Sequence, residues 1–234
     1  MTQRYGNFSS SEIHWLMQKS KTSNPFSVKG QTYIRQKRYE SRLQRPLKTD
    51  SDTRATIWGK FIESYVHELL TFDYRLCSKE RLAHKEIPNW TGAPDLITAD
   101  TVVDIKCPQL ESFCELADIC KETDPFELKA VYPEYYWQLV SNSILTGLDF
   151  AELIVFAPYK SELPGIRERA FAADAMEWGN KLYYIQYGED LELPYINDGG
   201  YYQNINKLTF KVPAEDKALL TDRVQLAIEQ LITH

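Results

Sequence analysis

The chain has 234 residues, 43% of them hydrophobic and 26% charged, and this composition excludes a disordered or fibrous protein. Its apolar runs, such as 153–157, are too short to cross a bilayer, and its first residues lack the apolar core of a secretory signal, so we expect a cytoplasmic protein with no membrane partner. The net charge of −6 is uneven, because residues 1–60 carry 12 Lys and Arg against 4 Asp and Glu while the remainder carries 15 against 29.

The first quarter of the chain is predicted to be helical and basic. Residues Ser9–Glu12 have the Ser-x-x-Glu form of a capping box, which predicts the start of a helix. A basic helix is expected over 27–43, ending before Pro46, and the polar stretch 45–53 is typical of a loop. Such a segment can bind a phosphate backbone, although a solvated basic helix has the same composition.

The strongest helical pattern covers residues 53–72, whose apolar side chains form one broad stripe. Within it, Gly59, Glu63 and His67 follow one another at intervals of four residues and share a face. Glycine lowers helix stability relative to alanine, which is easier to understand if backbone or ligand approaches there. We expect His67 to be a hydrogen-bonded side chain and not a metal ligand.

The middle of the chain alternates strands and helices. Residues 92–99 and 101–107 predict two short strands of a hairpin around Asp100. A helical insert follows over 109–121, and a helix over 133–146 begins at a proline and stops before a glycine.

The last third of the chain is predicted to complete the sheet. A buried strand is expected at 153–157, and two further strands at 181–187 and 208–212 flank a polar loop at 197–206. A final helix begins at Pro213. The alternation predicts an α/β protein, a central mixed sheet flanked by helices. In the absence of repeats and linkers we expect one domain over 1–234, with a basic helical N-terminal segment (about 1–50) and a C-terminal strand and helix extension (about 160–234).

Two acidic residues and one lysine carry the chemistry that the sequence predicts. In a strand, Asp104 and Lys106 point to one face while Val103 and Ile105 point into the core. Asp95 lies at or near the neighbouring strand, so two carboxylates and an ammonium group converge on one edge. An exposed hairpin with salt-bridged charges is the alternative interpretation.

This trio suits hydrolysis of a phosphodiester. Carboxylate oxygens are the ligands that Mg²⁺ prefers, and we expect Mn²⁺ to substitute for it. A bound metal polarises a phosphoryl oxygen and helps to generate hydroxide from water. The lysine can stabilise the developing negative charge or position the water. Glu63 would support the metal from its helix, unless it faces solvent.

The chain resembles the PD-(D/E)XK nucleases, and more narrowly the phage lambda exonuclease group, the YqaJ-type viral recombinases. The resemblance covers roughly residues 4–160. It rests on segments in the family's order: Arg4 with Ser11-Glu12-Ile13-His14, Trp58-Gly59-Lys60-x-x-Glu63, Pro94-Asp95, Asp104-Ile105-Lys106-Cys107-Pro108, and Tyr135-Tyr136-Trp137-Gln138. It departs from the family at Asp104, where the lambda group usually has Glu, and residues 111–133 and 188–206 have no counterpart.

The resemblance implies a restriction-endonuclease-like core and a set of roles. Asp95, Asp104 and Glu63 would be catalytic metal ligands, joined by the Ile105 carbonyl, and Lys106 would assist the water. Gln138 would orient a phosphate or the water. From their residue type alone, Tyr135, Tyr136 and Trp137 are expected to pack mostly in the core, with stacking of one of them on a base as the alternative. Arg4 and Ser11 would bind a terminal 5′-phosphate.

The resemblance also implies an activity and partners. The protein would be an exonuclease degrading double-stranded DNA ends from the 5′ side in phage-type recombination, as a ring-shaped trimer, together with a single-strand annealing protein. A DNA endonuclease of repair or defence and a catalytically inactive DNA-end-binding protein remain alternatives. The four cysteines are expected to be reduced thiols, and their spacing argues against the iron–sulfur cluster of some related nucleases.

Overall fold

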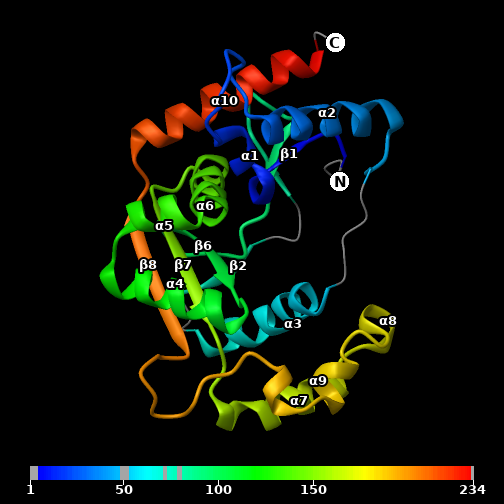
Figure 1. Cartoon of the computed structure of the whole chain (residues 1–234), viewed down its shortest axis with the longest axis vertical. Coiled ribbons are helices and arrows are strands. Elements are labelled where there is room, and N and C mark those ends of the chain that lie inside the picture. The colour runs from blue at the N-terminus through cyan, green and yellow to red at the C-terminus, as the bar shows by residue number, and fades with distance from the viewer. Residues whose placement is uncertain (1–4, 48–52, 71–72, 78–80, 233–234) are drawn as a thin grey trace.

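The computed structural model describes residues 5–47, 53–70, 73–77 and 81–232. A mixed five-stranded sheet forms its centre, with the order β2-β5-β6-β7-β8 (Figure 1). The strands of this sheet are β2 (Arg75–Leu76), β5 (Leu96–Ile97), β6 (Thr101–Lys106), β7 (Phe150–Phe156) and β8 (Ile205–Lys211). A small second sheet has the order β1-β4-β3 and consists of β1 (Phe8–Ser9), β4 (Trp90–Gly92) and β3 (Leu82–Ala83).

Strand β6 is the strand around which the candidate site is built. It pairs antiparallel with β5 and parallel with β7, from Thr101 opposite Phe150 to Lys106 opposite Val155. A parallel pair needs a crossover connection. That connection consists of α4 (Leu110–Glu122), α5 (Pro125–Val131) and α6 (Pro133–Thr146).

Helices cover both faces of the sheet (Figure 1). The larger apolar cluster lies on one face, between the sheet and the crossover helices, and extends to the N-terminal helices and the C-terminal helix. The other cluster lies between the opposite face and three helices. Besides the crossover helices, the first face carries η1 (Ser10–Glu12), α1 (His14–Met17), α2 (Val28–Leu43) and α10 (Ala214–Ile232); the second carries α3 (Arg54–Leu69), α7 (Leu163–Ala172) and α9 (Tyr183–Tyr187). The remaining short helices are η2 (Lys160–Glu162), α8 (Ala175–Trp178) and η3 (Asp190–Glu192).

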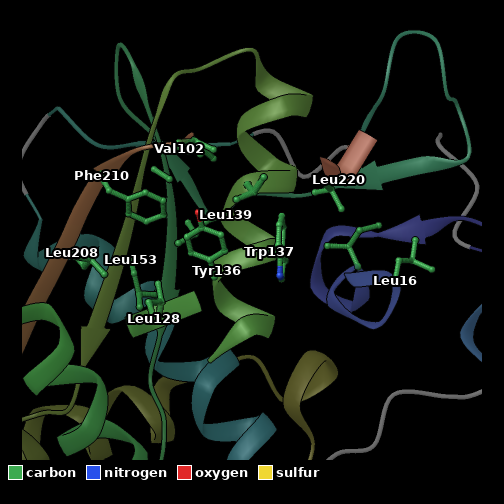
Figure 2. Packing of buried hydrophobic residues seen from close by; sticks show 14 of the residues in the cluster. Leu16, Val102, Leu128, Tyr136, Trp137, Leu139, Leu153, Leu208, Phe210 and Leu220 are labelled. Carbon is green, nitrogen blue, oxygen red and sulfur yellow. The ribbon is translucent and has the colours of Figure 1, made fainter. Parts of the chain in front are cut away.

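Helix α6 is fixed through its aromatic residues. Figure 2 shows Tyr136 and Trp137 among apolar side chains of the strands and of the terminal helices. The Tyr136 and Phe210 rings stack with centroids 5.6 Å apart, and the Tyr136 hydroxyl donates to Asp216 at 2.6 Å. Such an aromatic pair contributes about 0.5–1.5 kcal/mol beyond its burial. Because α6 is held in this way, the residues on its other side have defined positions over β6.

Local capping signals define several of the helix ends. The Ser27 hydroxyl caps α2 by accepting the Gly30 N–H at 3.1 Å, and the Thr53 hydroxyl caps α3 by accepting the Thr56 N–H at 3.2 Å. Helix α6 begins at a proline and ends at Gly147, whose φ of 76° lies in the left-handed region. The predicted helices over 27–43, 109–121 and 133–146 and the helix after Pro213 are therefore confirmed, and α3 ends three residues before the predicted 53–72 helix.

Three local predictions were wrong. The predicted strand 181–187 contains α9, because Leu182 and Ile185, three residues apart, are both buried against α7 and α3. The predicted capping box is absent, since the Ser9 hydroxyl forms no cap bond and pairs instead with the Ser11 hydroxyl at 3.2 Å.

The third wrong prediction concerns the single strand at 92–99. Residues 90–92 and 96–97 belong to different sheets, since Pro94, which lacks an N–H, interrupts the chain between them. The hairpin of β5 and β6 itself is confirmed.

No helix in the described part of the chain has the length and apolar character needed to span a membrane. All four cysteines are free thiols.

Candidate active site

Strand β6 places Asp104 and Lys106 on the face covered by α6. The Asp104 side chain is completely buried, and the Lys106 ammonium lies 2.5 Å from its Oδ2. Val103 and Ile105 point to the opposite face and pack in the cluster beneath α3. The alternation that the sequence predicted is therefore confirmed, and it brings a carboxylate and an ammonium group together at the end of the strand.

Asp95 joins these two residues from the chain just before β5. The register of β5 with β6 pairs Leu96 with Val103, and extending it by one residue places Asp95 beside Asp104. The Asp95 Oδ2 accepts the backbone N–H of Ile105 at 2.7 Å. The side chain of one predicted site residue is thus anchored to the strand that carries the others.

The same register explains the role of proline before Asp95. Thr98 donates its N–H to the Thr101 carbonyl, and hydrogen-bonded pairs of an antiparallel ladder recur at every second residue, which puts Pro94 opposite Ile105. Proline has no N–H to donate to the Ile105 carbonyl. A carbonyl oxygen is therefore left without its ladder donor at the edge where Asp95 lies.

Helix α3 contributes Glu63 from the other face of the sheet. This half-buried side chain lies near enough to Asp95 and Asp104 for the charges of these carboxylates to influence one another. His67 lies one turn further along α3 and is half-buried.

Helix α6 contributes Gln138, which contacts two strand residues with the two ends of its amide. Its Nε2 donates to Asp104 Oδ1 at 2.7 Å, and its Oε1 accepts from the Lys106 ammonium at 3.3 Å. The carboxylate and the ammonium each admit only one end of the amide, so the orientation of the side chain is determined. The five predicted catalytic residues all meet at the end of β6.

The electrostatics of the site are dominated by crowded negative charge. Burial and the charges of Asp104 and Glu63 hold the pKa of Asp95 well above its usual range. Burial and the Asp104 charge also raise the pKa of Glu63. Burial lowers the pKa of Lys106, but the nearby Asp104 and Asp95 outweigh it, so the net shift of that pKa is upward. The site stabilises positive charge and disfavours any further negative charge.

The donor set fits a divalent cation that keeps part of its water. No group of three or more His, Cys, Asp or Glu side chains among the described residues is arranged so that it could hold a metal ion by itself. Mg²⁺ is usually bound by one or two carboxylates, with waters and substrate phosphate completing its octahedron. The buried Asp104 Oδ2, which has an ion pair with Lys106 but no hydrogen bond, and the Asp95 carboxylate are oxygen donors of this kind.

The predicted phosphate-binding segment lies on the same face as Gln138. Ser10 of η1 shares a hydrogen bond with Ser141 of α6 at 2.8 Å, one turn from Gln138. The neighbouring Ser11 is exposed, as binding of a terminal phosphate would require. Arg4 lies outside the described residues.

One contact in the site was not predicted. The Lys106 ammonium lies over the ring of Tyr135, 5.1 Å from its centroid. Tyr135 precedes Gln138 by three residues, so both face β6 from the same side of α6. This spacing was a usable signal, but the run of three aromatic residues suggested core packing or stacking on a base.

The fold and the site have counterparts among known proteins. The architecture is the α/β fold of PD-(D/E)XK nucleases, with the acidic residues and lysine at the end of a central strand. Residues 1–149 match the model of the YqaJ-like viral recombinase domain, and the chain belongs to this family. No curated protein matches the chain.

Solved structures share the fold at low sequence identity. An alkaline exonuclease from Laribacter hongkongensis, LHK-Exo, is 13% identical with a TM-score of 0.64, covering 97% of this chain and 89% of that one. Its complex with dAMP is 14% identical with a TM-score of 0.65 and the same coverage. A phage-related exonuclease from Haemophilus somnus 129PT is 15% identical with a TM-score of 0.64, covering 96% of this chain and 93% of that one.

Proposed function

We propose that the protein is a Mg²⁺-dependent DNA exonuclease that degrades double-stranded DNA from its ends, in the 5′-to-3′ direction, in phage-type recombination. The observation that carries the proposal is the convergence of Asp95, Asp104 and Lys106 at one end of β6, with Gln138 bridging the last two. Family membership and the exonucleases named among the structural neighbours support it. We also propose that residues 1–234 act as one nuclease domain, since both apolar clusters pack on the same sheet.

The proposed metal ligands are Asp95, Asp104 and the Ile105 carbonyl, with Glu63 acting directly or through a water. A bound Mg²⁺ would polarise the phosphodiester and lower the pKa of a water molecule. Lys106 would donate to a non-bridging phosphate oxygen and stabilise the charge that develops there. Gln138 would hold Asp104 and Lys106 at a fixed separation through its two hydrogen bonds. Mn²⁺ is expected to replace Mg²⁺.

Recognition of the DNA end is proposed for the N-terminal segment. A terminal phosphate carries more charge than an internal diester, so Arg4 and the exposed Ser11 would distinguish the two. Wild type should cleave a 5′-phosphorylated duplex faster than a 5′-hydroxyl duplex. Arg4→Ala and Ser11→Ala should reduce this preference while cleavage continues, and equal rates on both ends in wild type would contradict the assignment.

One experiment separates the three candidate activities. Linear DNA labelled at either 5′ or 3′ end and covalently closed circles are incubated with the protein in Mg²⁺ or in EDTA, with Asp104→Asn as the matched inactive control. We expect early release of the 5′ label from linear DNA in Mg²⁺, and intact circles. Cleaved circles would identify an endonuclease, and retention of DNA ends without any cleavage would identify an inactive end-binding protein.

A ring-shaped trimer and a single-strand annealing partner belong to the same proposal. A group of exposed apolar side chains on α7 to η3 supports the presence of an interface, since exposed apolar patches often mark protein contacts. The Phe171 and Tyr187 rings in this group meet at 5.2 Å, and Tyr183 and Tyr187 at 4.7 Å. The mass in solution, measured by light scattering for wild type and Tyr187→Ser, tests the trimer.

A further inference from the structure

Within the part of the chain that the structure describes, the Lys106 ammonium contacts three side chains, and one of them has no function in the mechanism proposed above. Two partners are polar, namely Asp104 and Gln138. The third is the Tyr135 ring, whose centroid lies 5.1 Å from the nitrogen. The negative face of an aromatic ring attracts a cation at this distance. Only about a fifth of the Lys106 side chain is exposed, so water weakens this attraction less than at a surface.

The orientation of the Tyr135 ring is itself fixed. It stacks on Tyr132 with ring centroids 5.5 Å apart and an angle of 2° between the planes. The Tyr132 hydroxyl in turn donates to Glu115 of α4 at 2.5 Å. A chain of contacts therefore runs from α4 through two parallel rings to the ammonium group. This arrangement favours a rigid support over a base-stacking platform, because a nucleobase would compete with Tyr132 and Lys106 for the faces of Tyr135.

Asp104 cannot be the sole support of Lys106 during the reaction. It is a proposed metal ligand, so its oxygens are shared between two cations, whereas the Tyr135 ring has no second partner of that kind. A lysine side chain has four rotatable bonds, so its ammonium group keeps a single position only when neighbouring groups fix it. An ammonium that must meet a phosphate oxygen in one place needs such a support.

We propose that Tyr135 is a positioning residue that holds the Lys106 ammonium in its working place through a cation–π contact, an inference that rests on the nuclease function proposed above. The contact acts through Lys106 and does not involve the tyrosine hydroxyl. Tyr135→Leu should therefore lower kcat by roughly 5- to 30-fold, the loss expected for one partly desolvated cation–π contact. The affinity for DNA should stay unchanged.

The experiment measures single-turnover cleavage and DNA binding for three variants. Tyr135→Phe keeps the ring and should retain the wild-type kcat, whereas Tyr135→Leu removes the ring and should show the reduced kcat. The control is Tyr201→Leu, which removes another lysine–tyrosine pair far along the chain from the site. In that pair the Lys121 ammonium lies 4.4 Å from the centroid of an exposed ring and also donates to its hydroxyl at 2.7 Å. A fall in DNA affinity with unchanged kcat would overturn the proposal and indicate base stacking.

A graded series of substitutions tests the proposal even if the Tyr135→Leu variant does not fold. Phenylalanine carrying one, two or three ring fluorines at position 135 keeps the size of the ring but weakens the negative charge of its face. The proposal expects kcat to fall with each fluorine. A constant kcat across the series would overturn it.

A double-mutant cycle with Lys106→Ala distinguishes this inference from the proposed function. If Tyr135 acts through Lys106, then Tyr135→Leu should have no further effect in the Lys106→Ala background. Equal effects in both backgrounds would overturn the positioning role while the nuclease function stands. Full activity of Lys106→Ala would instead contradict the role assigned to Lys106 in the proposed function.

Discussion

The backbone N–H of Ile105 donates a hydrogen bond to the Asp95 carboxylate at 2.7 Å. Asp95 is thereby held against β6 while its charge lies close to those of Asp104 and Glu63. The fold fixes the position of this carboxylate and at the same time makes its ionised form unfavourable.

Asp95→Asn should raise the melting temperature of the metal-free protein at neutral pH. The asparagine Oδ1 can still accept the Ile105 N–H, and the substitution removes a charge that burial and two carboxylates disfavour. Since the folded-state pKa of Asp95 is raised, wild type loses stability as pH rises from the unfolded value of about 3.9 towards the folded value. The gain in the variant should therefore shrink as pH falls through that window.

Thermal unfolding in EDTA between pH 4 and pH 8 measures this difference. Asp198→Asn is the control, because a hydrogen bond from Ser161 lowers the pKa of Asp198 and its ionised form is favoured. This control should show no stabilisation. A lower melting temperature for Asp95→Asn at neutral pH would contradict the prediction.

Mg²⁺ should stabilise wild type and fail to stabilise Asp104→Asn. A ligand present at 10 to 100 times its Kd adds about 1.4 to 2.7 kcal/mol to the free energy of unfolding. The loss of one of two main carboxylate ligands should abolish most of that gain. Calorimetric titration and the melting temperature measure Mg²⁺ binding in the absence of DNA. They therefore test Asp104 as a metal ligand independently of whether the variant still cleaves DNA. Unchanged Mg²⁺ stabilisation of Asp104→Asn would exclude Asp104 as a ligand.

Gln138→Ala should lower kcat by roughly 10- to 100-fold, the usual cost of losing a side chain that orients metal ligands. Gln138→Glu should be more severe, because an oxygen would replace the Nε2 group that donates to Asp104 at 2.7 Å. Gln186→Ala, which removes a hydrogen bond to Ala170 on the other side of the sheet, is the matched control. If Gln138→Glu retained full activity, the bridge would have no function.

Gly59→Ala is expected to stabilise the protein and weaken its hold on DNA. A Cβ built at Gly59 meets no atom within 4 Å, so alanine should gain about 0.5–1 kcal/mol of helix stability. The open position lies one turn before Glu63, which is consistent with close approach of the substrate. Gly165→Ala on α7 has the same free space and should stabilise without affecting DNA affinity. Unaltered DNA affinity in Gly59→Ala would contradict a close approach of the DNA at this glycine.

The placement of the candidate site residues was largely predictable from the strand period. The alternation of β6 dictates that Asp104 and Lys106 share a face, and the signals at Pro133 and Gly147 define the helix that carries Gln138. The role of Pro94 was only partly readable. Its missing N–H matters through the register with Ile105, and a register between two strands depends on the folded sheet.

The wrongly predicted strand at 181–187 and the unpredicted partners of Glu152 share one cause, namely contacts between segments that are distant in sequence. The segment around Leu182 and Ile185 has the aromatic and β-branched content of a strand, but packing against α7 and α3 selects a helix. The buried Glu152 in the apolar strand β7 gives no local signal of its partners. They are the hydroxyl of Tyr74, just before β2, which donates to it at 2.7 Å, and the hydroxyl of Thr209 on β8, which donates to it at 2.6 Å.

The pairing of β6 with β7 limits where the gene could be shortened. The family match ends at residue 149, one residue before β7 begins, yet β7 pairs with every residue of β6 from Thr101 to Lys106. A polypeptide stopped at Asp149 would retain all five predicted catalytic side chains but present β6 as an unprotected apolar edge, a template for aggregation. The stretch of sequence by which the family is recognised is therefore shorter than the stretch that must be synthesised before the nuclease can fold.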